Sequence, residues 1–324
     1  MSRYVKISSI GNPPLPVPQG SSDDNAANLI LGWLEKNIEQ ALWDKPDILV
    51  LPETVISPAG YRLINYPGFY EIIGQRVFDL ISEKAGKHKT NIIYGCYMGE
   101  DGKMYNVQRF VNREGKAAGC YKKVYPIIRE IEMGICPGGK QDLMVSDCGT
   151  IAGSICFDLN FYPLLFQKAS QRPDMVIFSS AYHGGIMQKV WAYFCRAHFI
   201  GSISGTPNAI LNPAGVEIAS TTNYFNIVTG VINLDGALFH IDFNVTHYSR
   251  YAEAKKYYGP LLKVSDPGYL AAVYMTSESP DFTIDDVVKR FEFEKLDDYF
   301  DRSIKCAAKA RGEEFLWNLN SRDS

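Results

Sequence analysis

Residues 1–235 predict a single α/β domain in which helices cover sandwiched β-sheets. Short apolar runs of strand type alternate with longer segments whose apolar residues recur every three or four positions, and this alternation occurs twice along the chain. The composition agrees, because 46% of the 324 residues are hydrophobic and 13% are aromatic, enough for a sizeable core. The pattern is not interrupted by an internal repeat or a low-complexity tract.

The first half of the alternation begins with a strand and closes with a hairpin. Its strands are short apolar runs, and the one that ends in Glu53 is continuous enough to be buried on both faces. Its helices show apolar residues at helical spacing. In chain order, we expect a strand at 4–11, a helix at 25–43, a strand at 46–53, a helix at 68–88, a strand at 90–100 and a hairpin at 103–126.

The second half repeats the alternation and closes with strands around an Asn-Pro-Ala-Gly turn. In chain order, we expect a strand at 149–158, a helix at 162–171, a strand at 173–181, a helix at 186–200 and strands within 208–221 and 225–235.

Residues 236–324 differ in composition from the domain before them. They carry more charge and many aromatic side chains, and a proline interrupts them in "SESPDF". We interpret them as a C-terminal extension with helical pieces and not as a separately folded domain. Because so many aromatic side chains are costly to leave in water, we expect the extension to pack on the core or on a partner subunit.

Charge and cysteine usage argue against several classes of protein. The net charge of −3 gives no electrostatic reason to expect binding to nucleic acid or to an acidic membrane. There is no apolar window of membrane-helix length, and the N-terminus has no apolar signal core. Seven cysteines without CxxC spacing indicate reduced thiols in a cytoplasmic protein, and the five histidines are scattered. We therefore expect no metal and no cofactor.

A cysteine stands where one of the expected strands stops. In "GSICFDL", Cys156 follows an apolar run, and Asp158 comes two residues later, where it can orient the turn by accepting backbone N–H bonds. A strand-to-helix turn exposes side chains at the carboxyl edge of a sheet, where free N–H groups can bind an anion. A thiol nucleophile suits this position if a base and a cation accompany it. The alternative is a small buried apolar residue, which we expect for Cys96 and Cys195.

Two other stretches supply candidates for the base and the cation. Glu53 ends "ILVLPE", and a poorly solvated carboxylate there suits general-base work; a surface acid that ends a strand is the alternative. Lys122 and Lys123 follow the hairpin in "CYKKVYP". Adjacent residues of an extended segment face opposite sides, so one lysine can point inward, although paired lysines are often plain surface charge.

Together, these stretches resemble the nitrilase superfamily of carbon–nitrogen hydrolases, in the amidase-like branches. The resembling segments are "LVLPE", "GKAAGCYKKVYP" and "GSICFD", followed by "VWAYFCRAHFI" and "LNPAGVEIAS", and they cover about residues 4–235 in the right order. The resemblance implies a four-layer α-β-β-α sandwich at 1–235, followed by the extension at 236–324. It also implies a homodimer or a larger even-numbered homo-oligomer.

The resemblance implies a Glu-Lys-Cys triad. Carried over by position, Glu53 would be the base, Lys123 the cation and Cys156 the nucleophile. Lys123 is preferred to Lys122 because the lysine of the family is the third residue of a Tyr-basic-Lys pattern.

Further site residues follow from the same resemblance. A second glutamate is expected after the lysine; Glu130 is favoured by its distance from the preceding proline, whereas Glu132 fits the spacing to the Pro-Gly turn better. The backbone N–H of Phe157 would meet the oxyanion. His183 and Tyr61 are the further candidates for the substrate pocket.

The implied reaction is hydrolysis of a non-peptide carbon–nitrogen bond, in an amide or carbamoyl group of a small molecule, through a cysteine thioester with release of ammonia or an amine. Nitrile hydrolysis on the same triad, a non-catalytic nitrilase-like scaffold and a papain-type Cys-His hydrolase are the alternatives. Three positions depart from the pattern of the family: Asn160 replaces an arginine, Tyr125 a histidine and Gly201 a glutamate. The neighbours that shape the pocket are therefore altered.

Overall fold

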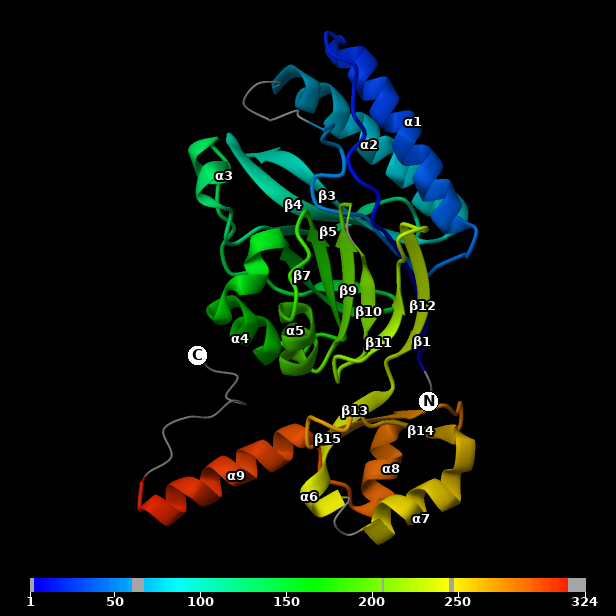
Figure 1. Ribbon diagram of the computed structural model, residues 1–324, viewed down its shortest axis with the longest axis vertical. Helices are drawn as coiled ribbons and strands as arrows, with labels where there is room; N and C mark the ends of the chain where they lie inside the picture. Colours follow the sequence, from blue (N-terminus) through cyan, green and yellow to red (C-terminus); the bar gives the residue numbers. More distant parts are fainter. Residues whose placement is uncertain (1–2, 60–66, 206, 245–247, 314–324) are drawn as a thin grey trace. The chain divides into compact units, whose positions relative to one another are not determined.

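The computed structural model describes residues 3–59, 67–205, 207–244 and 248–313 (Figure 1). Contacts divide the chain into two compact units. Val5–Ile232 form the larger unit, and Met1–Tyr4 with Asn233–Ser324 form the smaller unit. Each unit is described by itself.

Two six-stranded sheets make up the larger unit. The strands of the first sheet are β1 (Tyr4–Ile10), β2 (Ile48–Val50), β3 (Asn91–Glu100), β4 (Lys103–Val111), β5 (Ala117–Lys122) and β12 (Ile227–Asn233). Those of the second are β6 (Met144–Ser146), β7 (Gly149–Ile155), β8 (Met175–Ser180), β9 (His198–Ile203), β10 (Ala209–Leu211) and β11 (Glu217–Ser220). The first sheet has the order β12-β1-β2-β3-β4-β5 and the second the order β11-β10-β9-β8-β7-β6. Parallel pairing joins β1, β2 and β3 in one sheet and β7, β8 and β9 in the other.

Helices cover the outer face of each sheet. Helices α1 (Asp23–Leu42) and α2 (Pro67–His88) share an apolar core with the first sheet, and α4 (Tyr162–Ser170) and α5 (Met187–Cys195) share one with the second (Figure 1). The layer order is therefore α-β-β-α, and the predicted sandwich is confirmed. Two short helices lie at the ends of the sheets: α3 (Ile128–Glu132) and the 3-10 helix η2 (Cys156–Asn160).

Helix α1 shows why the sequence folds in this way. Ser22 caps it by accepting a bond from the backbone N–H of Asn25 at 3.3 Å. Its buried stripe repeats every four residues, through Ile30, Leu34 and Ile38. Each such side chain removed from water stabilises the fold by about 1.5–3 kcal/mol.

Small hydroxyl side chains join the facing sheets. Ser9 Oγ in β1 donates to the carbonyl of Gly201 in β9 at 2.6 Å. Ser179 Oγ in β8 donates to the carbonyl of Leu51, which follows β2, at 2.8 Å. Because serine is short, these bonds require the two sheets to lie close together where the larger unit is most buried.

Gly95 in β3 marks an even closer approach. A Cβ atom at this position would lie 2.5 Å from the carbonyl oxygen of Pro52 and 2.6 Å from the Cα of Glu53. Glycine is therefore required by the neighbouring backbone and not by its own torsion angles. The same approach allows the Gly95 N–H to donate to the Pro52 carbonyl at 3.1 Å, which holds the chain just before Glu53.

The helix predicted over 186–200 is wrong in its second half. Helix α5 ends at Cys195 because Arg196 adopts a left-handed conformation, with φ of 55°. His198–Ile203 then forms β9, a fully buried strand in the interior of the second sheet. A strand buried on both faces shows no alternation, so its apolar run cannot be distinguished from the end of a buried helix.

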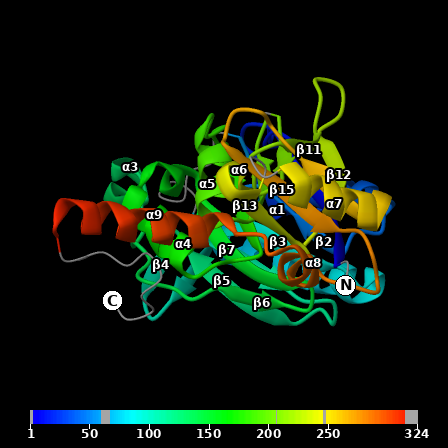
Figure 2. The same ribbon diagram turned by 90° about the horizontal axis from the view of Figure 1, so that it is seen from below.

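The smaller unit contains a sheet as well as helices. Its strands are β13 (Gly236–His240), β14 (Leu262–Ser265) and β15 (Ala272–Ser277), in the order β13-β15-β14. Its helices are α6 (Ile241–Asn244), α7 (Tyr248–Tyr258), η3 (Gly259–Leu261), α8 (Ile284–Phe291) and α9 (Leu296–Arg311). Helices α7 and α8 contact one another beside the sheet (Figure 1 and Figure 2). The unit also has a core of its own around Phe239 and Met275. Only helical pieces are predicted here from the sequence, because these strands are short and lie among charged residues.

Candidate active site

Three charged side chains meet in the interior of the larger unit. Lys123 Nζ lies 2.9 Å from Glu53 Oε1 and 2.7 Å from Glu130 Oε2. The exposed fractions of Lys123, Glu53 and Glu130 are 2%, 7% and 7%. Charges are seldom buried to this extent unless they are paired, and here one ammonium lies between two carboxylates.

The ends of the strands bring Glu53 and Lys123 together. Glu53 follows β2, an interior strand of the first sheet. Ala181 follows β8 of the second sheet, and its backbone N–H donates to Glu53 Oε2 at 3.0 Å. Lys123 comes directly after β5, where its N–H donates to the Asn106 carbonyl at 2.9 Å. Glu53 is thus held from both sheets.

Glu130 reaches the cluster from α3. Its Oε2 accepts from the backbone N–H of Ile127 at 2.9 Å, which fixes the first turn of this helix. Asn106 Nδ2 donates to Glu53 Oε1 at 2.8 Å and to Glu130 Oε1 at 2.9 Å. The amide therefore holds the two carboxylates side by side. Glu132, two residues further along α3, is exposed and lies outside the cluster.

Cys156 lies beside this group, at the point where β7 ends. It is the first residue of η2 and has φ of 48°, a left-handed conformation that is uncommon for residues other than glycine. Burial and the neighbouring charge of Glu53, with which the thiol forms a hydrogen bond, raise the pKa of Cys156 to about 12, although Lys123 opposes them. The resting thiol is therefore protonated, and it needs a base to become a nucleophile.

The electrostatics of Lys123 differ from those of the thiol. Burial disfavours its charged form, but the charges of Glu53, Cys156 and Glu130 outweigh burial and raise the pKa of Lys123 above its ordinary value. The ammonium therefore stays charged at neutral pH. It is a permanent positive charge beside the sulfur.

Asp158 connects the cysteine turn to the lysine loop. It is fully buried, and its carboxylate accepts from Tyr121 Oη at 2.8 Å, from the Tyr125 N–H at 2.7 Å and from the Ile155 N–H at 3.1 Å. The expectation that Asp158 orients this turn through backbone N–H groups is confirmed. Burial raises the pKa of Asp158 to about 6.

The paired lysines point to opposite sides of their segment. Lys123 is inside, whereas Lys122 forms an ion pair with Glu100 and lies 4.5 Å from the centre of the Tyr105 ring. The alternation of an extended segment produces this difference.

The structure does not bring every candidate into the cluster. Phe157 is 40% exposed and its ring meets Phe161 edge to face, whereas the group expected to meet the oxyanion is its backbone N–H, which directly follows Cys156. His183 is exposed and accepts a bond from the Gly185 N–H at 3.2 Å. It lines a hollow of about 170 Å³ whose wall includes none of Glu53, Lys123 and Cys156. Tyr61 lies outside the described residues.

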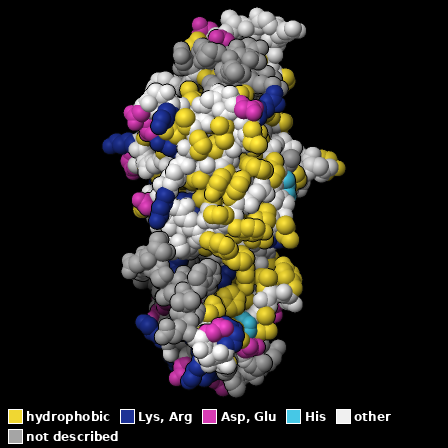
Figure 3. All heavy atoms as spheres, turned by 90° about the vertical axis from the view of Figure 1, so that its left-hand side faces the viewer, with side chains coloured by type: hydrophobic (Ala, Val, Ile, Leu, Met, Phe, Trp, Pro, Cys, Tyr) yellow, Lys and Arg dark blue, Asp and Glu magenta, His cyan; other side chains and the backbone are white. Residues whose placement is uncertain are grey.

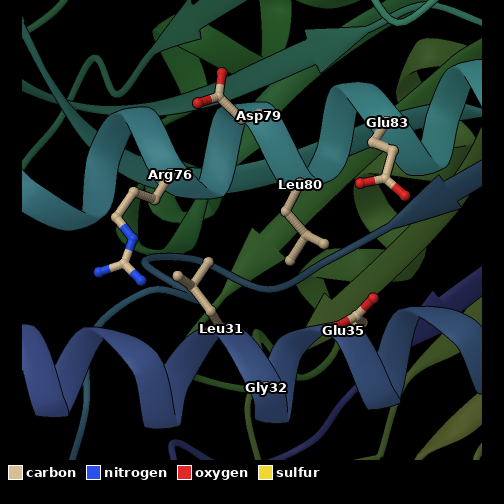
Figure 4. A pocket seen from close by; sticks show the side chains of 7 residues that line it. All are labelled: Leu31, Gly32, Glu35, Arg76, Asp79, Leu80 and Glu83. Carbon is tan, nitrogen blue, oxygen red and sulfur yellow. The ribbon is translucent and has the colours of Figure 1, made fainter.

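A larger hollow of about 360 Å³ lies between α1 and α2 (Figure 4). The side chains around it come from these two outer helices and include none of the buried cluster. Its wall is formed by Leu31, Gly32, Glu35, Arg76, Asp79, Leu80 and Glu83. Buried charge, and not the size of a hollow, therefore locates the candidate site.

Within the described ranges, no group of histidine, cysteine, aspartate and glutamate side chains is arranged to hold a metal ion. Over the same residues, none of the helices has the length and apolar character needed to cross a membrane.

Comparison with known proteins identifies the class of enzyme. The model of the carbon–nitrogen hydrolase family matches residues 15–205, more than half of the chain. The relatives described next agree with this match, because their names include an omega-amidase and an amidase from the nitrilase superfamily. The chain belongs to the carbon–nitrogen hydrolase family.

Two curated relatives illustrate the match. The chain is 28% identical over 198 residues to the omega-amidase NIT3 of Saccharomyces cerevisiae, covering 56% of this chain and 67% of NIT3. It is 33% identical over 130 residues to the probable hydrolase YhcX of Bacillus subtilis, covering 40% of this chain and 24% of YhcX.

Solved structures of an amidase from Nesterenkonia share the fold. One superimposes with a TM-score of 0.61 at 14% identity, covering 71% of this chain and 90% of the amidase. Another, which carries the acetamide moiety of fluoroacetamide on its active-site cysteine, superimposes with a TM-score of 0.61 at 13% identity, covering 72% and 91%.

Proposed function

We propose that the protein hydrolyses an amide or carbamoyl group of a small molecule through a thioester on Cys156. The observation that carries the proposal is the buried Lys123 ammonium, which bridges Glu53 and Glu130 beside the sulfur. A cluster of this kind costs stability, and a scaffold that only binds a ligand has no need of it.

Glu53 acts first as a base. It takes the proton of the Cys156 thiol, with which it already forms a hydrogen bond, and the sulfur attacks the carbonyl carbon. The carbonyl oxygen becomes an oxyanion, which the Lys123 ammonium and the Phe157 backbone N–H stabilise. Glu53 then gives its proton to the leaving nitrogen. The carbon–nitrogen bond breaks, ammonia or an amine departs, and the acyl group remains on Cys156 as a thioester.

A water molecule completes the cycle. Glu53 removes its proton as the oxygen attacks the thioester carbon, and the proton passes to the departing sulfur of Cys156. The products are a carboxylic acid and the regenerated thiol. Glu130 and Asn106 take no part in bond making; they hold Glu53 and Lys123 in place.

The substrate is an amide rather than a nitrile. The omega-amidase of yeast and the Nesterenkonia amidase support this choice, because both names describe amide hydrolysis. Asn160 stands where the family often has an arginine, so we expect no anionic group of the substrate at that position. We propose that His183, two residues after the Ala181 whose N–H binds Glu53, lines the substrate pocket.

The test is ammonia release from a panel of amides, ureas and nitriles, with butyramide included. We expect release from at least one amide, an acyl adduct on Cys156 by intact mass, and no turnover in the folded variant Cys156→Ala. Turnover by Cys156→Ala within about tenfold of the wild-type rate would rule out the nucleophile, since covalent catalysis contributes far more than this. Ammonia release from nitriles alone would show that the substrate is a nitrile and not an amide.

We also propose that the enzyme is a homodimer or a larger even-numbered homo-oligomer. Large apolar side chains are exposed together on one side of the larger unit, where Figure 3 shows them gathered. They belong to α3, α4, α5 and the loop before α5, and include Ile128, Ile131, Tyr162, Phe166, Ile186 and Phe194. The C-terminal extension, 236–324, contributes to the interface.

Light scattering tests the assembly. The full chain should have the mass of an even-numbered oligomer, and truncation after residue 240 should lower it. A monomeric full chain would exclude the oligomer, and a soluble truncated protein of unchanged oligomeric state would exclude the extension from the interface.

We propose a cytoplasmic, reducing location. All seven cysteines are free in the structure, including the exposed Cys306. Thiol titration of the protein purified without reductant under argon should count seven thiols.

A further inference from the structure

Helix α4 buries a lysine that the proposed reaction does not use. Lys168 is 1% exposed, and its Nζ donates to the backbone carbonyl of Gln141 at 2.9 Å. Within the part of the chain that the structure describes, it forms no ion pair with a carboxylate. A buried ammonium without such a partner is costly, and an apolar residue would fill the space without that cost. The buried charge of Lys168 therefore indicates a role beyond packing.

Tyr121 connects this lysine to the active site. Lys168 Nζ lies 5.3 Å from the centre of the Tyr121 ring, within the range of a cation–π contact. The hydroxyl of the same ring donates to Asp158 Oδ2 at 2.8 Å. One aromatic side chain thus contacts the ammonium with its face and the carboxylate with its hydroxyl.

Asp158 needs its negative charge for its work. It accepts three hydrogen bonds, and two of the donors are the N–H groups of Ile155 and Tyr125. Ile155 precedes Cys156, and Tyr125 follows Lys123 by two residues. A protonated carboxyl group loses part of this acceptor capacity, so protonation loosens the link between the cysteine turn and the lysine loop. Burial raises the pKa of Asp158 to about 6, although its three hydrogen bonds and the charge of Lys123 oppose burial, so the ionised form depends on the positive charges around it.

We propose that Lys168 is a positioning residue whose buried charge keeps Asp158 ionised, so that Asp158 holds the Cys156 turn against the Lys123 loop. This role rests on the proposed function of Cys156. It extends the site to a helix on the outer layer of the sandwich.

The groups that face Lys168 agree with this role. Burial lowers the pKa of Lys168 to about 8, against the attraction of Asp158, Asp142 and Cys195. Lys168 is therefore charged at neutral pH and neutral at alkaline pH. Since an electrostatic attraction between two groups acts equally on both, the charge of Lys168 favours the ionised form of Asp158.

A purely structural role is the competing explanation. The side chain of Gln141 accepts from the Lys122 N–H and donates to the Lys122 carbonyl, each at 2.7 Å. Lys168 could therefore serve only as a tether of the Gln141 segment. The loss of a tether would affect the site equally at every pH, whereas the loss of a charge would not.

The experiment measures the rate at which iodoacetamide labels Cys156, by peptide mass mapping, in the wild type and in Lys168→Met. At about pH 9 the two rates should agree within about twofold, because Lys168 is then neutral and Asp158 ionised in both proteins. At about pH 6 the variant should react about two- to fivefold more slowly, since its Asp158 is more often protonated. A loss that is the same at both pH values overturns the proposal.

Two further variants control the comparison. Lys84→Met removes another buried lysine, which lies on α2 and outside the candidate site. The rate at which Cys156 is labelled in this variant should equal the wild-type rate at every pH. Lys168→Arg, which restores the charge, should recover the rate at about pH 6; recovery by Lys168→Gln instead would overturn the proposal.

A measurement on the wild type keeps the proposal testable if Lys168→Met does not fold. The carboxyl carbon of Asp158, followed by NMR, should show its main inflection near pH 6 and a smaller one near about pH 8, where Lys168 loses its proton. Absence of the second inflection overturns the charge coupling. Absence of any labelling of wild-type Cys156 would instead overturn the proposed function and this role with it.

Discussion

Two lysines of the larger unit each bridge two glutamates, but they lie in opposite surroundings. Lys84 Nζ, on α2, is 2.6 Å from both Glu35 and Glu39 of α1, whose side chains are 51% and 33% exposed. Lys123 has the same number of partners at similar distances, but the side chains of Glu53 and Glu130 are only 5% and 9% exposed. The geometry of the ion pairs is nearly equal, and access to water differs.

The comparison shows that solvation decides what an ion pair does. Around Lys84, water and salt screen the charges, so the bridge only joins α1 to α2. Around Lys123, the charges act at close range on the Cys156 sulfur, and burial of all three charged side chains reduces their screening by solvent. Glu35 also lines the larger of the two hollows described above, so the presence of a hollow does not by itself locate a catalytic site.

The largest expected effect comes from breaking the buried bridge. Lys123→Ala should lower kcat for the best amide by about 10²–10³ or more, because it removes the cation that we propose stabilises the oxyanion. The matched control is Lys122→Ala, which removes the half-buried neighbour paired with Glu100 and should change kcat by less than about twofold. Equal losses of kcat in the two variants would show that the cation is wrongly assigned to Lys123.

A second, smaller effect should separate the two glutamates of α3. Glu130→Gln should lower kcat by roughly 10²-fold, because the amide no longer balances the ammonium and Lys123 shifts from its position. Glu132→Gln, at the exposed position of the same helix, should retain wild-type activity. Steady-state ammonia release measures both. A larger loss of kcat in Glu132→Gln than in Glu130→Gln would show that Glu132, and not Glu130, supports Lys123.

The smallest effect belongs to the bridge of Lys84, a buried lysine whose two carboxylate partners reach water. Lys84→Met should lower the free energy of unfolding by about 1 kcal/mol, with kcat unchanged, because an ion pair with solvent-accessible carboxylates stabilises weakly. Urea denaturation measures the difference, which should shrink in about 1 M salt as screening increases. A change in kcat would show that α1 and α2 influence the site after all.

Much of the fold and of the cluster could be predicted from the sequence, for a physical reason. Glu53, Lys123 and Cys156 each stand at the end of a strand-like run, and strand ends are what the sequence pattern marks best. The choice between Glu130 and Glu132 could not be made, because the spacing of a five-residue helix does not determine which side faces inward. The contact with Lys123 resolves which of them lies in the cluster.

Other features had no signal that sequence reasoning could use. Asn106 and the Ala181 N–H contact the carboxylates across strands that are far apart in the chain, although a polar residue inside the apolar alternation of β4 could have drawn attention to Asn106. Strand β9 was missed because an apolar run buried on both faces has no period of its own.

Gly95 has a consequence for anyone who wishes to redesign this enzyme. The backbone before Glu53 rests where a single methyl group on β3 would have to go, at 2.5 Å from the Pro52 carbonyl. A library that varies the residues around the sulfur can therefore change which molecules enter. A library that varies codon 95 should instead displace Glu53, the proposed base, and we expect its members to lose turnover for every substrate alike.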